Sequence, residues 1–313
     1  MSPAPRRRTR LALGTAALVL AGSALAACGS SGTTASDPGP ADTTPVSDAS
    51  APVPAESPST PDTASAPSSS ATATTEVPVY YVMATPEGQK LVEEQHEVPQ
   101  GQELEGALAA LSNPTDPDYR SYYASGDLDS VSYDGDKFTV SLHDTGLEDR
   151  GSLTKADATI AVQQLAYTLD AVQQSEGAPT VVVAGSGDTP VTLYGVDTAG
   201  GVNLGDQIKT LALVNVLSPA SGENVSGTLD ASGLASSFEG NVPWTITDDS
   251  GTVVKKGFAT AEGWMDRLYP WSKQIDVSSL KPGDYTFTAM TDDPSGGTEG
   301  HGPTKDTKRF TIS

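Results

Sequence analysis

The alternation of apolar and polar residues predicts a first structured region that mixes strands and helices. Residues 77–82 and 91–98 have the composition and alternation of β-strands. Apolar positions then repeat at helical spacing over residues 104–111, and the two prolines within 113–117 end this helix. The region therefore opens with two strands and a short amphipathic helix.

A hairpin and a longer helix follow along the chain. Asp134-Gly135 is a strong turn signal between the strand patterns of residues 130–133 and 137–142. Thr154 is in place to cap a helix with Asp157 three residues later. The apolar stripe of that helix consists of Ala158, Val162, Leu165, Leu169 and Val172, and Gly177 follows its end. Two further strands are expected at 180–184 and 191–195. We expect an α+β domain over residues 76–210, with a mixed sheet and two helices on one face.

The pattern changes from Leu213 onward. Short alternating strands are separated by turn-forming stretches at 220–224, 248–251 and 281–284, and no helical stripe occurs between them. This spacing is typical of an all-β sandwich of about 100 residues. We therefore place an immunoglobulin-like β-sandwich over residues 211–313.

Several segments of the first region resemble a GerMN domain, a family named from sporulation and germination proteins and common in lipoproteins of Gram-positive bacteria. The segments are the start at Val79-Tyr80-Tyr81-Val82, the helix at 105–111, the Asp134-Gly135 hairpin and the helix at 163–169. Related small α+β domains build rings and envelope assemblies. The resemblance therefore implies a scaffold or interaction role.

The second region is similar to the immunoglobulin-like domain of bacterial spore germination proteins. The resemblance is carried by Val216-Leu217-Ser218-Pro219 with Gly222, by Phe238-Glu239-Gly240, by Gly251 and by residues 280–285. Lipoproteins of the same kind carry these two domains in this order. The family name does not itself place the protein in spores.

The N-terminus has the three parts of an export signal. Four arginines between residues 6 and 10 precede an apolar run from Leu11 to Leu25, which is shorter than the ~20 residues of a membrane-spanning helix. Leu25-Ala26-Ala27-Cys28 resembles the lipobox of bacterial lipoproteins, which implies a signal peptide over 1–27 and lipid (palmitate) on Cys28. The alternative is a secreted protein cut near Ala27 with a free thiol, while Arg7-Arg8 matches a twin-arginine signal poorly.

Residues 28–75 have the composition of a disordered tether. Beyond Cys28 they are almost entirely Ser, Thr, Ala, Pro, Asp and Gly, without an aromatic side chain. A flexible chain of this length reaches about 35–40 Å on average. We expect a lipid-anchored protein on the outer face of the cytoplasmic membrane, whose folded part moves through the adjacent wall.

Charge excludes one class of partner. The formal net charge is −22, and cleavage of the four N-terminal arginines makes it −26, since −22 − 4 = −26. Nucleic-acid binding needs a basic face, so it is excluded. We expect partners to be the membrane, through the lipid on Cys28, and an envelope protein or a cell-wall polymer.

Catalytic and metal chemistry have weak signals. His96, His143 and His301 are isolated from carboxylates and cysteines at metal-ligand spacing, and His143-Asp144 lacks a nucleophile elbow. The acids at 127–136 do not match a calcium loop, because Val131 stands where a ligand oxygen is needed. Asp248-Asp249 and Asp292-Asp293 are interpreted as turn residues, with calcium as the minor alternative. We expect no enzyme activity and no cofactor.

Trp264, Tyr269 and Trp271 crowd one short segment of the sandwich. Exposed aromatic faces stack on sugar rings, so these three residues are candidate ligand-facing positions. The alternative is packing, because Phe238, Trp244 and one of the three are needed to fill the core. The first functional hypothesis is a non-enzymatic interaction or scaffold module of the cell envelope. The second is a wall-carbohydrate-binding module that positions or modulates a separate hydrolase.

Overall fold

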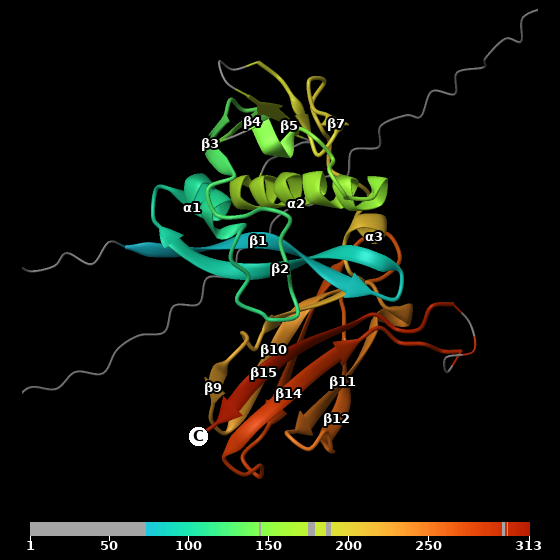
Figure 1. Cartoon of the computed structure of the whole chain (residues 1–313). Helices are drawn as coiled ribbons and strands as arrows, with labels where there is room; N and C mark the ends of the chain where they lie inside the picture. Colours follow the sequence, from blue (N-terminus) through green and yellow to red (C-terminus); the bar gives the residue numbers. More distant parts are fainter. Residues whose placement is uncertain (1–72, 144, 175–178, 186–188, 296–297, 299) are drawn as a thin grey trace, which may run out of the picture. The chain divides into compact units, whose positions relative to one another are not determined.

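The computed structural model describes residues 73–143, 145–174, 179–185, 189–295, 298 and 300–313. Within these residues the predicted fold class is confirmed: an α/β region with few helices precedes an all-β sandwich (Figure 1). The predictions on the signal peptide, on Cys28 and on the tether as far as residue 72 lie outside the described residues. The predicted end of the tether at residue 75 was wrong, because Thr74 and Thr75 already pair with Pro99 and Val98.

The α/β region opens with a long antiparallel hairpin. Strands β1 (Thr74–Thr85) and β2 (Gly88–Pro99) pair along their whole length. Successive side chains of a strand point to opposite faces, and here both faces are buried. Val79 and Tyr81 enter the main core of the region, whereas Tyr80 and Val82 belong to a second apolar cluster.

Two helices pack on this hairpin. Helix α1 spans Glu103–Ala110 and helix α2 spans Lys155–Gln173. The predicted cap is observed, because the Thr154 side chain accepts a hydrogen bond of 3.1 Å from the backbone N–H of Asp157. The chain leaves α2 through Gln174 in the left-handed conformation, and the predicted stop at Gly177 lies outside the described residues.

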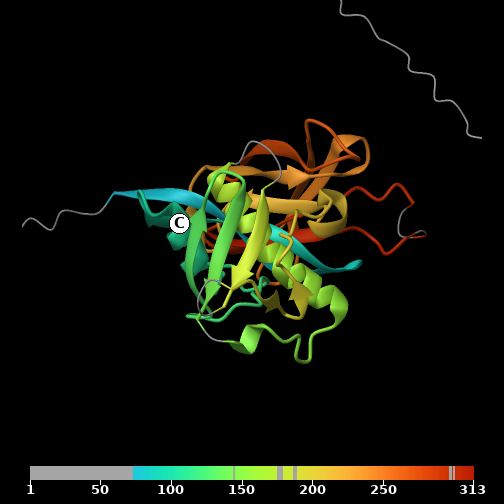
Figure 2. The same ribbon diagram turned by 90° about the horizontal axis from the view of Figure 1, so that it is seen from above.

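The other three long strands of the α/β region, β3, β4 and β5, form a separate sheet. Strand β4 (Lys137–Leu142) pairs antiparallel with β3 (Leu128–Tyr133) and parallel with β5 (Thr180–Ala184), so this sheet is mixed. Seen from above, the three strands lie side by side over the helices (Figure 2). The helices cover one face of this sheet, as predicted, but the β1–β2 hairpin forms a further layer on the other side of the helices.

The expectation of a single mixed sheet in this region was therefore wrong in one respect, because β1 and β2 form a two-stranded sheet of their own. The hairpin does not join β3, because groups from elsewhere bond to the outer edge of β1. Val82 exchanges two backbone hydrogen bonds with Arg120, of 2.8 and 3.0 Å. The N–H of Tyr80 donates to the hydroxyl of Thr168 on α2 at 2.9 Å.

Short elements complete the region and lead to the sandwich. They are the 3-10 helix η1 (Thr145–Leu147), strands β6 (Thr192–Leu193) and β7 (Val196–Asp197), and helix α3 (Gln207–Thr210).

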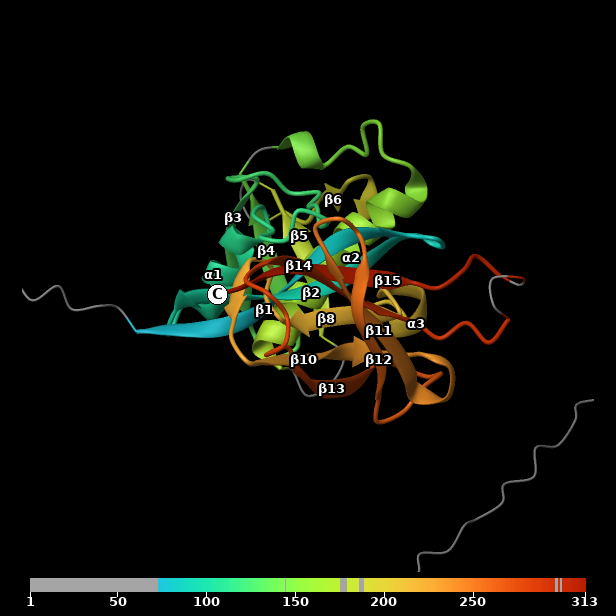
Figure 3. The same cartoon turned by 90° about the horizontal axis from the view of Figure 1, so that it is seen from below.

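The sandwich consists of a three-stranded and a five-stranded sheet (Figure 3). Strand order in the first is β13 (Tyr269–Asp276), β10 (Thr228–Ala235), β8 (Val214–Ser218). In the second it is β12 (Val253–Thr260), β11 (Asn241–Asp248), β14 (Gly283–Met290), β15 (Lys305–Ile312), β9 (Glu223–Val225). A short 3-10 helix, η2 (Phe238–Gly240), precedes β11.

A buried ion pair connects the sandwich to the α/β region. Lys308 on β15 donates from Nζ to the Asp116 carboxylate at 2.7 Å and to the Tyr119 hydroxyl at 2.6 Å. The Tyr119 hydroxyl in turn donates to the carboxylate of Asp306, at 3.0 and 2.9 Å from its two oxygens. All four side chains are at most 5% exposed. Burial raises the pKa of both Asp306 and Tyr119, because it penalises the charged form of each group.

Asn215 on β8 extends this network to the hairpin. Its side-chain amide accepts from the backbone N–H of Glu93 at 2.9 Å and donates to the backbone carbonyl of Glu93 at 3.1 Å. The side chain thus makes the pair of bonds that a neighbouring strand would make. The two regions also make apolar contacts, since Leu268 and Leu234 of the sandwich pack in the same cluster as Tyr80 and Val82 of the hairpin.

Glu94 holds the loop that carries Asp116. It accepts hydrogen bonds from the N–H and hydroxyl of Thr115, at 2.9 and 2.5 Å, and from the N–H of Asp116 at 3.1 Å. Its Oε1 also lies 2.9 Å from Nε2 of His96. Burial alone raises the pKa of Glu94, but these hydrogen bonds outweigh it and lower the pKa from 4.5 to about 2.

Replacement of Lys308 by Met is expected to destabilise the protein by about 3–5 kcal/mol, because it leaves two carboxylates buried without their cation. Lys305→Met is the matched control, since Lys305 lies on the same strand and is exposed. Urea unfolding at pH 7 measures the loss of stability in each of the two variants. Equal midpoints for the two variants would show that the buried pair contributes nothing.

Glu94 predicts a specific acid sensitivity. A carboxylate whose pKa is lowered by folding stabilises the protein above its unfolded pKa, and this contribution is lost as the pH falls through the folded pKa. Glu94→Gln should therefore be less stable than the wild type at pH 7, and the gap should narrow as the pH falls from about 4.5 to about 2. Urea midpoints across this range test the prediction, with Glu97→Gln on the same strand as the control. A gap that is constant with pH would contradict it.

Candidate binding surfaces of the sandwich

The aromatic residues singled out in the sequence divide between core and surface. Trp271 is 3% exposed, and its ring stacks with Phe287 at a centroid distance of 6.4 Å. Trp244 is also buried and stacks with Phe287. Trp271 is therefore a core residue, and its proposed ligand-facing role does not fit the structure, because its alternation on β13 turns it between the two sheets.

Phe238 was expected in the core, and this expectation was wrong. Phe238 is 42% exposed, because it lies in η2, in the connection between β10 and β11, and not in a strand of either sheet. The ring meets that of Trp264 edge to face, with centroids 5.2 Å apart and planes at 70°. Trp264 itself is 38% exposed. The pair presents aromatic surface to solvent at one end of the sandwich.

Tyr269 is half-buried beside this pair. The Arg267 guanidinium lies 4.7 Å from the centre of the Tyr269 ring, and the hydroxyl donates to Asp266 at 2.8 Å. Gly263 makes the arrangement possible, because a Cβ at this position would come within 2.7 Å of the ring. The Tyr269 ring therefore packs mainly against the loop of residues 261–268, and little of it is available to a ligand.

Met265 extends the exposed surface. It is 68% exposed, and its backbone adopts φ +88°, a conformation that costs energy for a residue with a side chain. Its N–H donates to the Ser236 hydroxyl at 3.0 Å, which holds the loop in place. We call Phe238, Trp264 and Met265 the aromatic end. Sequence reasoning missed Phe238 and Met265, since neither has a local signal for exposure.

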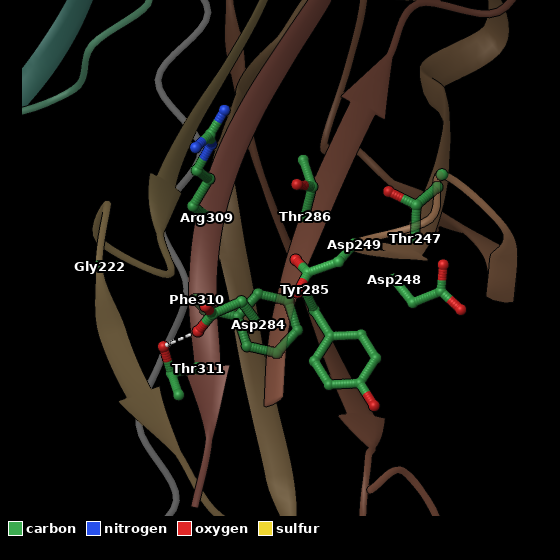
Figure 4. Close-up of a pocket in the computed structure, with 11 residues that line it drawn as sticks. Gly222, Thr247, Asp248, Asp249, Asp284, Tyr285, Thr286, Arg309, Phe310 and Thr311 are labelled. Atoms are coloured by element: carbon green, nitrogen blue, oxygen red, sulfur yellow. Dashed lines mark hydrogen bonds between the residues drawn. The ribbon is translucent and has the colours of Figure 1, made fainter. Parts of the chain in front are cut away.

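A hydroxyl-lined hollow lies on the outer face of the five-stranded sheet (Figure 4). Its volume is about 490 Å³. Thr247 and Thr286 face each other across β11 and β14, and Arg309 on β15 lies opposite Thr286. Asp249 and Asp284 supply carboxylates, and Asp284 accepts a 2.6 Å hydrogen bond from Thr311. The lining therefore combines hydroxyl, carboxylate and guanidinium groups.

His96 and the acidic turns form hydrogen bonds within the fold and, among the described residues, are not gathered into a metal site. Nε2 of His96 lies 2.9 Å from the Tyr81 hydroxyl, which donates to a backbone carbonyl of α1 at 2.6 Å. Asp134 and Asp248 accept hydrogen bonds from the backbone of their own turns. Within the described ranges, no three His, Cys, Asp or Glu side chains are grouped so that they could hold a metal ion.

No helix in the described part of the chain has the length and apolar character needed to cross a bilayer.

Comparison with known proteins gives a family match for one of the two regions. Residues 213–298 match the family model described as the immunoglobulin-like domain of bacterial spore germination. No curated protein matches the chain.

The solved structures that resemble this chain do so loosely. The tandem GerMN domains of the sporulation protein GerM from Bacillus subtilis share 14% identity over 66% of this chain and 62% of theirs, with a TM-score of 0.31. CopC from Methylosinus trichosporium OB3b shares 16% identity over 32% of this chain and 93% of its own, with a TM-score of 0.22. An engineered protein shares 16% identity over 49% of this chain and 36% of its own, with a TM-score of 0.27.

TM-scores below 0.5 carry no argument for a fold or a function, so the GerMN resemblance of the first region stays a resemblance. The second region has a direct match that agrees with its turn motifs and with its two packed sheets. Over residues 213–298 the chain is similar to the immunoglobulin-like domain of bacterial spore germination.

Proposed function

We propose that this chain is a non-enzymatic binding module, linked to sporulation or germination, that captures a protein partner in the cell envelope on the aromatic end of its sandwich. One observation carries the proposal. The large hydrophobic side chains that are exposed in the described residues all belong to the sandwich: Phe238, Val253, Phe258, Trp264 and Met265. Three of these five, Phe238, Trp264 and Met265, form the aromatic end. Exposed apolar surface on an otherwise polar protein is typical of an interaction site.

The chemistry of this end favours a protein partner. Aromatic residues, methionine and arginine are the side chains most enriched at the centres of protein interfaces. Phe238 and Trp264 are in contact at this end, and Met265 and Arg267 lie in the same loop as Trp264. The buried network around Lys308 supports the proposal further, because it connects the sandwich directly to the α/β region and so provides a scaffold for the site. The immunoglobulin-like family match supports the link to spore germination.

The double variant Phe238→Ala/Trp264→Ala should lose at least tenfold in affinity for the partner, because truncation of central aromatic residues typically costs more than 1 kcal/mol each. A photo-crosslinking residue at Met265 in living cells identifies the partner, and calorimetry with the purified partner gives the affinities. Glu97→Ala on β2 is the control. Unchanged affinity in the double variant would refute the aromatic end as the site.

A wall-carbohydrate-binding role is the second candidate, and the hollow of Figure 4 favours it. Hydroxyl, carboxylate and guanidinium groups on a sheet face match the donors and acceptors of a sugar chain. The aromatic residues give this role less support, since Trp271 is buried and, of the two tryptophans near residues 264–271, only Trp264 offers an exposed face.

Co-sedimentation of residues 28–313 with purified cell wall tests this second role. Thr247→Val/Thr286→Val should abolish pelleting if the hollow binds sugar, because it removes two hydroxyls with little change of shape. Phe238→Ala/Trp264→Ala should leave pelleting intact. Absence of wild-type pelleting at physiological salt would rule out carbohydrate binding.

We further propose that lipid on Cys28 anchors the chain at the outer face of the cytoplasmic membrane. The lipobox-like sequence before Cys28 supports this anchor. Cys28→Ser should move the protein from the membrane fraction to the medium and abolish incorporation of a clickable palmitate analogue. Full labelling of Cys28→Ser would contradict the assignment.

A further inference from the structure

The sandwich ends in four edge strands, and they differ in how each edge is closed. The edge of β8 is covered by the α/β region, where Asn215 pairs with the backbone of Glu93. Strand β9 is only three residues long, and β13 contains Pro270 near its start. Strand β12 extends over eight residues without a proline, and within the described residues only β11 pairs with it. A free edge presents unpaired backbone groups to a further strand.

The side chains of β12 are unusual for an edge exposed to water. Phe258 is 62% exposed and Val253 is 50% exposed. The strand also contains Lys255 and Lys256 and no acidic residue, in a chain of net charge −22. Among the described residues, neither lysine lies within ion-pair distance of a carboxylate, although Lys255 is near enough to Asp276 on β13 to help lower the pKa of that carboxyl. The strand is thus a cationic and apolar strip on an acidic protein.

Charge decides between the possible occupants of this edge. Lysines on an edge strand oppose pairing with a second copy, because antiparallel pairing of two β12 strands brings cations together and joins two strongly acidic chains. The same lysines attract carboxylates. Protection against self-association explains the lysines but does not explain an exposed phenylalanine two residues beyond them.

The strip is continuous with the aromatic end. Phe258 lies opposite Pro243 on β11, and Thr260 at the end of β12 lies opposite Asn241, which directly follows η2. The next residue, Ala261, donates a backbone hydrogen bond of 2.8 Å to Gly240 of η2. A strand added along β12 therefore runs towards Phe238 and the loop that carries Trp264.

We infer that β12 receives an extended segment of the partner protein by β-strand addition, and that this segment carries carboxylates beside apolar residues. The inference rests on the proposed function and specifies the partner at the same surface. Backbone hydrogen bonds to β12 supply affinity, Lys255 and Lys256 select acidic side chains, and Phe258 packs against an apolar side chain of the segment.

The test uses two labelled eight-residue peptides, one in which pairs of glutamates alternate with pairs of valines and one in which pairs of lysines alternate with pairs of valines. This pattern places both residue types on each face of the added strand. Fluorescence anisotropy with residues 28–313 should show saturable binding of the glutamate peptide and at least tenfold weaker binding of the lysine peptide. Lys255→Glu/Lys256→Glu should reverse this preference, and Phe258→Thr should weaken binding. Lys281→Glu/Lys305→Glu is the matched control, since it makes the same charge change at exposed positions elsewhere in the sandwich.

Hydrogen exchange separates strand addition from loose attraction. Bound peptide should slow the exchange of amides in β12, whereas attraction between charges alone would leave them unprotected. No saturable binding, or binding that Lys255→Glu/Lys256→Glu leaves unchanged, would overturn the inference. So would a dimer in sedimentation that Phe258→Thr dissolves, because the occupant would then be a second copy.

The two proposals fail in distinguishable ways. If crosslinking at Met265 identifies a partner whose affinity depends on Phe238 and Trp264 but not on Lys255, Lys256 or Phe258, the proposed function stands and the inference about β12 is wrong. If no partner depends on the aromatic end, the proposed function itself is wrong.

Discussion

One buried cation holds the two regions of this chain in contact. Lys308 reaches out of the sandwich to Asp116 and Tyr119, while Asp306, two residues earlier on the same strand, accepts from the Tyr119 hydroxyl. Charges removed from water in this way are costly unless each one is paired and hydrogen-bonded. The contact is therefore favourable only in one arrangement, in which every donor and acceptor of the network finds its partner.

The surrounding structure supports that arrangement from both sides. Glu94 fixes the loop that carries Asp116. The side-chain amide of Asn215 makes two hydrogen bonds with the backbone of Glu93, as a neighbouring strand would. Leu268 adds apolar contact, and it ends the loop that carries Trp264 and Met265. The base of the exposed aromatic loop is thus part of the contact between the two regions, so the position of the aromatic end depends on the buried network.

Local patterns in the sequence were sufficient to predict the elements and the fold class. Thr154 caps its helix, Asp134-Gly135 turns its hairpin, and the turn motifs from Leu213 onward separate the strands of a sandwich. Such features depend on residues close together in the chain. The separation of the hairpin from the mixed sheet could not be read in this way, because it depends on Arg120 and Thr168 reaching β1 from distant positions.

The candidate site was predictable only in part, for a similar reason. Composition located aromatic residues near 264–271, but it could not tell that Trp271 points between the sheets while Trp264 and Phe238 meet at the surface. Asp116 and Lys308 are separated by 192 positions, and each alone has the pattern of an ordinary surface charge. Edge position is equally invisible in sequence, since β12 is exposed by the order of strands in its sheet.

The bond between Asn215 and Glu93 has a consequence for how such domains combine. Each region contributes only part of the hydrogen-bonding set at their contact, so either one, produced alone, exposes polar groups that the other satisfies. A different domain placed before this sandwich would have to offer a backbone pair for Asn215, a carboxylate for Lys308 and a hydroxyl for Asp306 in the same geometry. The sandwich is therefore matched to its neighbour and is not a freely exchangeable module, although its sequence has the pattern of an independent domain.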